Sequence, residues 1–325
     1  MISNSIFTIN SENEFVSKTF EIFYYQYQQL PLYRDFCDLL KRTPANVNSL
    51  EDIPFLPIRF FRTHQILTTS TYQLYFESSG TTSHTTSRHY ISDISLYETS
   101  FRKVFALFYT DPSKYLWLAL MPDTNERPHS SLLYMVNSFI QSSEYKESGF
   151  YLYRTNELYR VLLHSIQQNI PTLLIGLTYA LLDFAEVYSL PQNNSLIVME
   201  TGGMKGRRKE MMRAEVHQIL KKSFSVNQIH SEYGMTELLS QAYSKKNGLF
   251  KSPPWMRVLI RDVNNPLRRG LIEKRGGINI IDFANIYSCS FIETEDMGIV
   301  HHDGTFEVIG RLQGSIQRGC NTMIE

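Results

Sequence analysis

The sequence predicts a layered α/β fold, because short apolar runs alternate with longer amphipathic segments through its middle. Four runs are mostly continuous in apolar residues, as buried parallel strands are: 115–121, 172–175, 195–199 and 226–230. The segments 156–168 and 207–224 lie between them and place apolar residues three and four apart, as one face of a helix does. Strand, helix and strand in repetition require crossover connections, which build layers of helix and sheet.

The two ends of the chain differ in pattern from the middle. Apolar spacing predicts helices over 14–29 and 92–109, whereas two prolines prevent a regular helix over 53–57. Short alternating runs after Pro253 predict antiparallel strands, with a hairpin turn at 302–304. We therefore expect one domain over the 325 residues with three approximate lobes: helical and loop-bearing (1–110), α/β (111–250) and β-rich (251–325).

Composition and charge narrow the possible partners. Lys+Arg and Asp+Glu total 32 each, so no global basic field holds nucleic acid or an anionic membrane. The longest apolar stretch, 173–184, contains polar residues, and the N-terminus lacks the regions of a signal peptide, so we expect neither a membrane span nor a leader. Cys37, Cys289 and Cys320 form no CxxC pair, which argues against a disulfide framework and a cysteine-rich zinc site. A cytoplasmic protein is the expectation.

The most specific string is Tyr75-Phe-Glu-Ser-Ser-Gly-Thr-Thr-Ser83, a strand-like entry followed by small hydroxyl residues around a glycine. Such a loop presents backbone N–H groups and hydroxyls to phosphate oxygens. The pattern GxxxxGK[ST] of P-loop enzymes is absent from it. Taken alone, this composition also fits a flexible surface loop.

A second string, Ser231-Glu-Tyr-Gly-Met-Thr-Glu237, directly follows the predicted strand that ends at His230. Ligands of open α/β sheets bind at the carboxyl ends of strands, so these side chains are candidates for a site. Glu237 is suited to Mg²⁺ between phosphates, because this ion takes one or two carboxylates together with phosphate oxygens. A carboxylate that begins a helix is an equally good interpretation of Glu237 alone.

Taken in order, the two strings resemble motifs of the adenylate-forming superfamily of acyl-CoA synthetases, firefly luciferase and peptide-synthetase adenylation domains. Two later strings extend the resemblance: 293–298 is similar to the TGDxG segment, and 310–316 to the GRxxDxI hinge. The resemblance implies an α/β ligase that uses ATP and Mg²⁺ and releases AMP and pyrophosphate. The nucleotide-binding residues that it implies are Ser78, Ser79, Gly80, Thr81, Thr82, Tyr233, Gly234, Thr236, Asp296 and Arg311.

The same resemblance implies a role for each of the later residues. Tyr233 lies beside adenine, Thr236 contacts phosphate, Asp296 holds the ribose hydroxyls and Arg311 contacts the nucleotide. Glu237 is the Mg²⁺ ligand. Since attack of a carboxylate on ATP sets anion against anion, the site also needs cations and oriented donors.

Within the superfamily the chain looks most like the LuxE-type acyl-protein synthetases, which act in the bacterial luminescence fatty-acid reductase complex. The similar segments are 53–61, 201–206 and 317–321. Those enzymes transfer an activated acyl group to a cysteine near their own C-terminus, and Cys320 occupies that position. The resemblance implies a fatty or other apolar acid as substrate, a thioester on Cys320 and an acyl-CoA-reductase-like partner. Since the chain ends soon after the hinge string, we expect the family's mobile C-terminal domain and its catalytic lysine to be absent.

Departures from the family pattern leave other hypotheses open. The lysine expected after the Ser-rich loop is replaced by His84 and Arg88, and the hinge aspartate by Gln313 or Gly314. Lys205 is a further candidate catalytic cation, although the basic run 205–209 also fits a solvated helix start. One alternative is an acyl-CoA ligase of the phenylacetate-CoA ligase type. Another is a nucleotide-binding subunit of a reductase complex without chemistry of its own.

Overall fold

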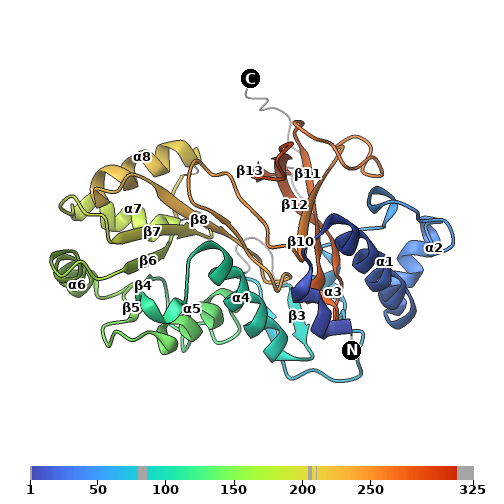
Figure 1. The fold of residues 1–325 in the computed structure, drawn as a ribbon, viewed down its shortest axis with the longest axis horizontal. Helices are drawn as coiled ribbons and strands as arrows, with labels where there is room; N and C mark the ends of the chain where they lie inside the picture. Colours follow the sequence, from blue (N-terminus) through green and yellow to red (C-terminus); the bar gives the residue numbers. More distant parts are fainter. Residues whose placement is uncertain (1, 80–85, 204–206, 210, 313–325) are drawn as a thin grey trace.

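The fold is built on two large β-sheets. The computed structural model describes residues 2–79, 86–203, 207–209 and 211–312. The first sheet has six strands in the order β5-β4-β6-β7-β8-β9, and Figure 1 shows it as the left half of the molecule. Its strands run parallel except β9, which pairs antiparallel with β8. They are β4 (Leu116–Leu120), β5 (Gly149–Phe150), β6 (Thr172–Leu177), β7 (Leu196–Thr201), β8 (Ile229–Tyr233) and β9 (Ala242–Ser244).

Helices cover both faces of this sheet. Figure 1 shows α7 and α8 on one face, and α4 and α5 on the other. Rings from α4, β4 and α5 form the core on the second face: Trp117 lies 5.1 Å from Phe105 and 4.7 Å from Phe139, between ring centroids. These helices are α4 (Ile94–Phe108), α5 (Ser131–Ser142), α6 (Thr155–Gln167), α7 (Thr178–Val187) and α8 (Arg213–Phe224), and the 3₁₀ turn η3 (Pro112–Lys114) precedes β4.

The second sheet is mostly antiparallel and stands near the centre of Figure 1, with α1 and α2 to its right. Its strands are β10 (Met256–Arg261), β11 (Gly276–Asp282), β12 (Phe291–Val300) and β13 (Phe306–Arg311), and β1 (Leu56–Pro57) pairs parallel with β12. The predicted hairpin turn is confirmed between β12 and β13, where Gly304 has φ +80° and its N–H donates to the His301 carbonyl at 3.0 Å.

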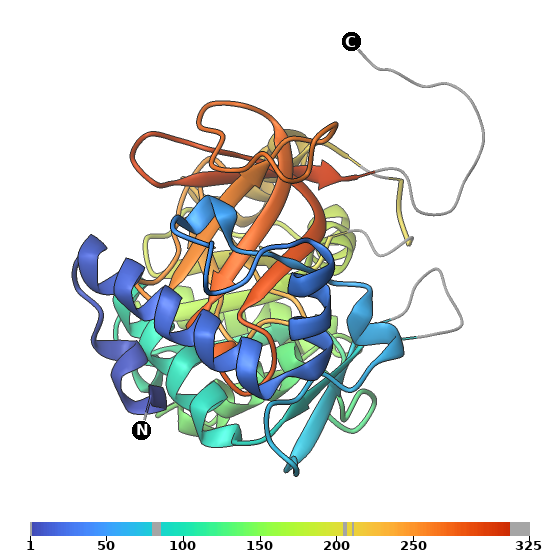
Figure 2. The ribbon, with the colours of Figure 1, turned by 90° about the vertical axis from the view of Figure 1, so that its right-hand side faces the viewer.

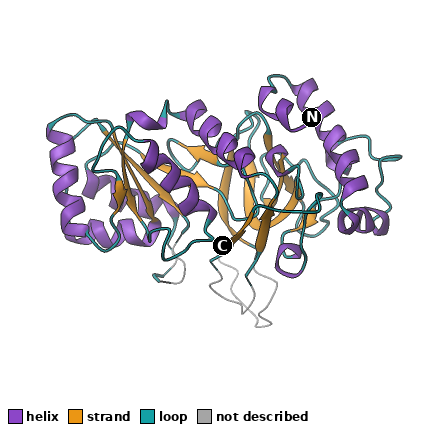
Figure 3. Cartoon of the chain, turned by 90° about the horizontal axis from the view of Figure 1, so that it is seen from below, coloured by secondary structure: helices purple, strands orange, loops and turns teal. Residues whose placement is uncertain are grey.

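The N-terminal helices pack on this second sheet, and Figure 2 shows α1 lying across it. The Gln26 amide donates to the carbonyls of Asn285 and Ile286, at 3.1 Å each. The N-terminal elements are η1 (Ile2–Thr8), α1 (Glu12–Gln29), α2 (Pro31–Leu39), η2 (Leu50–Asp52) and α3 (Phe60–Thr63). A short ribbon of β2 (Leu74–Glu77) and β3 (Arg88–Ile91) follows, and η4 (Phe283–Asn285) connects β11 to β12. Seen from below, helices lie around the strands of both halves (Figure 3).

Most predicted elements are confirmed, and two boundaries are wrong for a local reason. The strand predicted from 226 begins at Ile229, because Ser225 adopts φ 50° after α8 and the chain needs further residues to turn back. The helix predicted from 207 begins at Arg213, where Glu215 accepts the Met212 N–H at 3.2 Å. The helix α7 was not predicted, because one apolar run, 173–184, contains both most of β6 and most of α7. Such a continuous run shows no boundary between a buried strand and a buried helix.

The loop after β8 is tied to the second sheet through one buried side chain. Asp282, at the end of β11, accepts the N–H groups of Leu239 (3.0 Å), Ser240 (2.9 Å) and Ala284 (3.1 Å) and the Ser240 hydroxyl (2.7 Å). Burial raises the pKa of Asp282 to about 6, and these donors oppose the rise. The donors favour the ionised carboxylate, which fixes the loop that contains Glu237.

No described helix is long and apolar enough to cross a membrane. Cys37 and Cys289 are buried, free thiols in the cores of the helical and β-rich parts.

Candidate active site

The candidate site begins where β8 ends, because Tyr233 is the last residue of that strand. Its hydroxyl donates to a carboxylate oxygen of Asp296, on β12, at 2.8 Å. The Tyr233 ring is buried with its edge contacts on the stacked pair Phe250 and Phe306, whose ring centroids lie 5.9 and 5.8 Å away. This bond joins the two large sheets at the position where the first one presents its strand ends.

Arg311 extends this pair toward solvent. Asp296 and Arg311 face each other in the β12–β13 register, and Arg311 Nε lies 3.7 Å from Asp296 Oδ1. Burial raises the pKa of Asp296, while the Tyr233 hydrogen bond and the charge of Arg311 oppose the rise. The Arg311 side chain is 79% exposed, so its guanidinium is available to a ligand. We call Tyr233, Asp296 and Arg311 the Tyr–Asp–Arg chain.

Glu237 lies four residues after Tyr233 and is buried, with 5% of its surface exposed. Burial raises its pKa, and a hydrogen bond with the Ser87 side chain and the charges of Arg62 and Arg311 oppose the rise. In the described segment 231–244 the chain turns at Glu237 and starts no helix, so the helix-start interpretation is wrong. The carboxylate instead lies in a buried turn, where the charges of Arg62 and Arg311 favour its ionised form and burial disfavours it.

The described part of the Ser-rich loop is closed at its base. The Ser78 N–H donates to the Ser87 carbonyl at 3.0 Å, and the Ser78 hydroxyl oxygen accepts the Ser87 N–H at 2.9 Å. Ser79, the next residue, is exposed. The base of the loop therefore adjoins Glu237 through Ser87. The other loop residues predicted to bind nucleotide, Gly80, Thr81 and Thr82, lie outside the described residues.

The turn between Tyr233 and Glu237 is tightly packed. A Cβ at Gly234 would lie 2.5 Å from a carboxylate oxygen of Glu232, so any larger residue here would displace that side chain. The Thr236 carbonyl is 2.9 Å from His89 Nδ1, and the Glu237 carbonyl accepts the Asn285 amide at 2.7 Å. The backbone carbonyls of Thr236 and of Glu237, the candidate metal ligand, are therefore both fixed by hydrogen bonds.

The remaining predicted catalytic residues, Lys205 and Cys320, lie outside the described residues. Of the basic run that begins at Lys205, Arg208 pairs with Asp183 and Glu186, and Arg207 lies over the Tyr179 ring at 4.9 Å. The helix-start interpretation of this run is wrong, since α8 begins at Arg213.

Three other residues considered from the sequence are engaged elsewhere. Arg88 pairs with Glu77 at 2.9 Å. His230 Nδ1 lies 2.9 Å from the Tyr109 hydroxyl, and burial lowers the pKa of His230 to about 4. His301 lies between Glu273 (2.8 Å) and Glu307 (3.0 Å) beside the hairpin. Among the described residues, no group of three or more His, Cys, Asp or Glu side chains is arranged to hold a metal ion.

Sequence reasoning missed Arg62, Ser87 and His89. Arg62 lies on α3, shortly after the proline-containing segment 53–57. Its guanidinium lies 3.6 Å from the carboxylate of Glu295, the residue before Asp296. Ser87 and His89 follow the Ser-rich string by only a few residues. Their proximity to the string was visible, but their contacts with a loop about 150 residues later were not.

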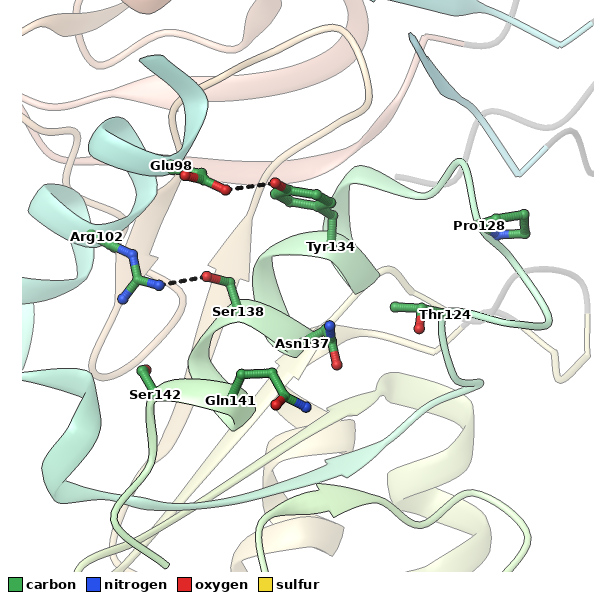
Figure 4. Close-up of a pocket in the computed structure, with 9 residues that line it drawn as sticks. All are labelled: Glu98, Arg102, Thr124, Pro128, Tyr134, Asn137, Ser138, Gln141 and Ser142. Atoms are coloured by element: carbon green, nitrogen blue, oxygen red, sulfur yellow. Dashed lines mark hydrogen bonds between the residues drawn. The ribbon is translucent and has the colours of Figure 1, made fainter. Parts of the chain in front are cut away.

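A surface groove of about 500 Å³ lies between α4 and α5, apart from these residues (Figure 4). Its two charged side chains are engaged, because Glu98 accepts the Tyr134 hydroxyl at 2.6 Å and Arg102 donates to Ser138 at 2.7 Å. None of the predicted site residues that the structure describes lines it. The lining residues are Glu98, Arg102, Thr124, Pro128, Tyr134, Asn137, Ser138, Gln141 and Ser142.

The fold is shared with solved CoA ligases and synthetases. A 2-hydroxyisobutyryl-CoA ligase structure with 2-HIB-AMP and CoA aligns with 94% of this chain and 69% of its own, at 13% identity and a TM-score of 0.66. ATP-bound MatB from Rhodopseudomonas palustris aligns with 73% of this chain and 47% of its own, at 12% identity and a TM-score of 0.56. O-succinylbenzoate coenzyme A synthetase (MenE) from Bacillus subtilis, with ATP and magnesium ion, aligns with 78% of this chain and 53% of its own, at 17% identity and a TM-score of 0.51.

These comparisons confirm the α/β class and establish the likeness at the level of the fold. The chain spans about half the length of the MatB and MenE chains. No protein-family model matches the chain, and no curated protein matches its sequence. The narrower resemblance to the acyl-protein synthetases stays a prediction.

Replacing Tyr233 with Phe should weaken the junction between the sheets, because it removes the donor to the buried Asp296 carboxylate. Urea denaturation should show a loss of about 1.5–3 kcal/mol in the free energy of unfolding, as for hydrogen bonds to charged groups. The matched control is Tyr243→Phe, which removes the hydroxyl of another buried tyrosine of the same sheet, on β9. Equal losses in the two variants would contradict a specific contribution of the Tyr233–Asp296 bond.

Proposed function

We propose that this protein activates a carboxylic acid with ATP to form an acyl-adenylate and pyrophosphate. One observation carries the proposal: Glu237, the Tyr–Asp–Arg chain and the base of the Ser-rich loop are neighbours, although the sequence separates them widely. The four motifs that suggest adenylation therefore converge on one place. The shared fold with ligases solved with ATP or an adenylate supports the same proposal.

The proposed first step breaks one phosphoanhydride bond and forms one mixed anhydride. A carboxylate oxygen of the acid bonds to the α-phosphorus of ATP, and the α–β bridging oxygen leaves with pyrophosphate. Arg62 and Arg311 lie near enough to Glu237 to affect its pKa, so their charges also act on phosphates bound there. One carboxylate oxygen of Asp296 accepts the Tyr233 hydroxyl, and a carboxylate has further acceptor positions that would take ribose hydroxyls.

The residues present fit one Mg²⁺ ion. This ion takes one or two carboxylates and completes its shell with water and phosphate oxygens, so the single carboxylate of Glu237 suffices. When bound, Mg²⁺ would offset the negative charge of the phosphates. Burial raises the pKa of Glu237, and a bound cation would lower it again, because a positive charge favours the ionised carboxylate.

We further propose that the acyl group passes to Cys320 as a thioester, for delivery to a reductase-like partner. The Cys320 thiolate attacks the acyl carbon, and AMP leaves. The resemblance of the C-terminal string to acyl-protein synthetases motivates this step, with Arg318 nearby to favour the thiolate. The other two thiols are poor acceptors, because burial raises the pKa of Cys289 to about 12 and raises that of Cys37 further. A fatty or other apolar acid is the proposed substrate.

Coenzyme A is the alternative acceptor, and one observation favours it. Two of the solved structures that share the fold are a CoA synthetase and a CoA ligase, and the ligase structure contains CoA. Under this alternative the adenylation step is unchanged, and the acyl group is found on CoA rather than on the protein. A subunit without chemistry is the weaker hypothesis, because the described motif residues are assembled rather than dispersed.

Glu237→Gln should abolish most adenylation, because the amide has similar size and lacks the charge that Mg²⁺ requires. Acid-dependent exchange of labelled pyrophosphate into ATP should fall at least about a hundredfold, roughly 2.7 kcal/mol of barrier. Glu273→Gln, on the surface beside His301, is the matched control and should retain exchange. Unchanged exchange in Glu237→Gln would remove this residue from the metal role.

Labelled fatty acid and ATP should leave hydroxylamine-sensitive label on the wild-type protein and none on Cys320→Ser. The reason is that the serine hydroxyl is far less ionised than a thiol and makes a poor acceptor. Cys289→Ala, which changes a buried thiol, should retain the label. Label retained in Cys320→Ser would refute the acceptor role, and formation of acyl-CoA with no protein label would identify CoA as the acceptor.

A further inference from the structure

We infer that His89 is a positioning residue, which aligns the Thr236–Glu237 turn with the base of the Ser-rich loop. The inference rests on the proposed function for its effect on catalysis, but its structural part stands separately. His89 lies on β3, is 1% exposed, and contacts three separate parts of the chain, at Phe61, Thr236 and Ser288.

The two ring nitrogens of His89 have different partners. Nδ1 lies 2.9 Å from the Thr236 carbonyl, and Nε2 lies 2.8 Å from the Ser288 hydroxyl. A carbonyl oxygen only accepts hydrogen bonds, so Nδ1 carries the proton and donates it to Thr236. In the neutral ring Nε2 then accepts from Ser288. The tautomer is thereby assigned by the partners, and each nitrogen has a separate function.

The segment that leads into β3 holds the turn at two neighbouring positions. Ser87 directly precedes β3 and His89 lies on it, and both side chains reach the Thr236–Glu237 turn. The Ser87 side chain bonds with the Glu237 carboxyl group, and the Ser87 backbone closes the Ser-rich loop with Ser78. His89 holds the carbonyl of Thr236, the preceding residue. The segment 87–89 therefore fixes both the base of the Ser-rich loop and the turn that contains Glu237.

The opposite side of the turn is held independently of His89. The Asn285 amide donates to the Glu237 carbonyl at 2.7 Å, and the Leu239 N–H donates to Asp282 and Asn285 at 3.0 Å each. The rest of the loop therefore stays docked when the His89 bond is lost. What changes is the orientation of the Thr236–Glu237 peptide, and with it the direction of the Glu237 carboxylate.

Two substitutions separate the two bonds of His89. An Asn amide nitrogen reaches about as far as Nδ1, so His89→Asn retains the donor to Thr236 and loses the contact with Ser288. A Gln amide reaches about as far as Nε2, so His89→Gln retains the contact with Ser288 and loses the donor to Thr236. Each variant loses one buried hydrogen bond, and the two should have similar urea midpoints.

The test compares acid-dependent ATP–pyrophosphate exchange at varied Mg²⁺ in both variants. His89→Asn should keep kcat within about threefold of wild type, whereas His89→Gln should lower it roughly tenfold and raise the Mg²⁺ concentration for half-maximal rate. Ser288→Ala should lower stability and leave both kinetic quantities unchanged. Equal losses of kcat in His89→Asn and His89→Gln would overturn the inference.

A second readout keeps the inference testable if the wild-type protein catalyses no exchange, which would refute the proposed function instead. Hydrogen–deuterium exchange of the segment 234–241 should rise in His89→Gln relative to wild type and His89→Asn. Equal protection of this segment in the two variants would overturn the positioning role, whatever the reaction.

Discussion

The arrangement of the candidate site depends on one buried carboxylate, Asp282. It accepts hydrogen bonds from the backbone of Leu239, Ser240 and Ala284 and from the Ser240 hydroxyl. These donors offset part of the desolvation of the charge and fasten the loop after β8 to the end of β11. Asp282 holds the loop just beyond Glu237, whereas Asn285 and His89 hold the carbonyls of Glu237 and Thr236.

Two smaller contacts complete what Asp282 begins. Tyr233 donates to Asp296 across the sheets, and His89 connects β3 to the Thr236 carbonyl. Together they bring motif residues from three strands, β8, β12 and β13, and the base of the Ser-rich loop close to Glu237, with Arg62 and Arg311 as the nearby cations. Each of these cations has a carboxylate beside it, Glu295 for Arg62 and Asp296 for Arg311. The side chain of Arg311 is 79% exposed, so its guanidinium is open to a phosphate although the total charge of the chain is balanced.

Much of this could be predicted from the sequence, for reasons that differ between residues. The buried strands β4, β6 and β7 are continuous apolar runs, and the motif residues Tyr233, Glu237, Asp296 and Arg311 stand in recognisable strings. Asp282, His89 and Arg62 stand in no such string, because their importance comes from partners far along the chain. The pairing of β1 with β12 could not be predicted for the same reason. The prolines in the segment of β1 exclude a regular helix but do not indicate a partner strand. Local patterns predict elements, whereas long-range contacts decide which side chains meet.

The central claim is that an oxygen of the acid becomes bonded to the α-phosphorus of ATP, and an isotope measurement tests it directly. The protein is incubated with ATP, Mg²⁺ and a panel of carboxylic acids that are labelled with ¹⁸O in the carboxylate. The masses of the nucleotide products are then measured by mass spectrometry. When a thiol or water takes the acyl group, the bridging oxygen stays with AMP. The account predicts AMP that carries a single ¹⁸O atom from the acid. Unlabelled AMP, or ADP as the product, would contradict it.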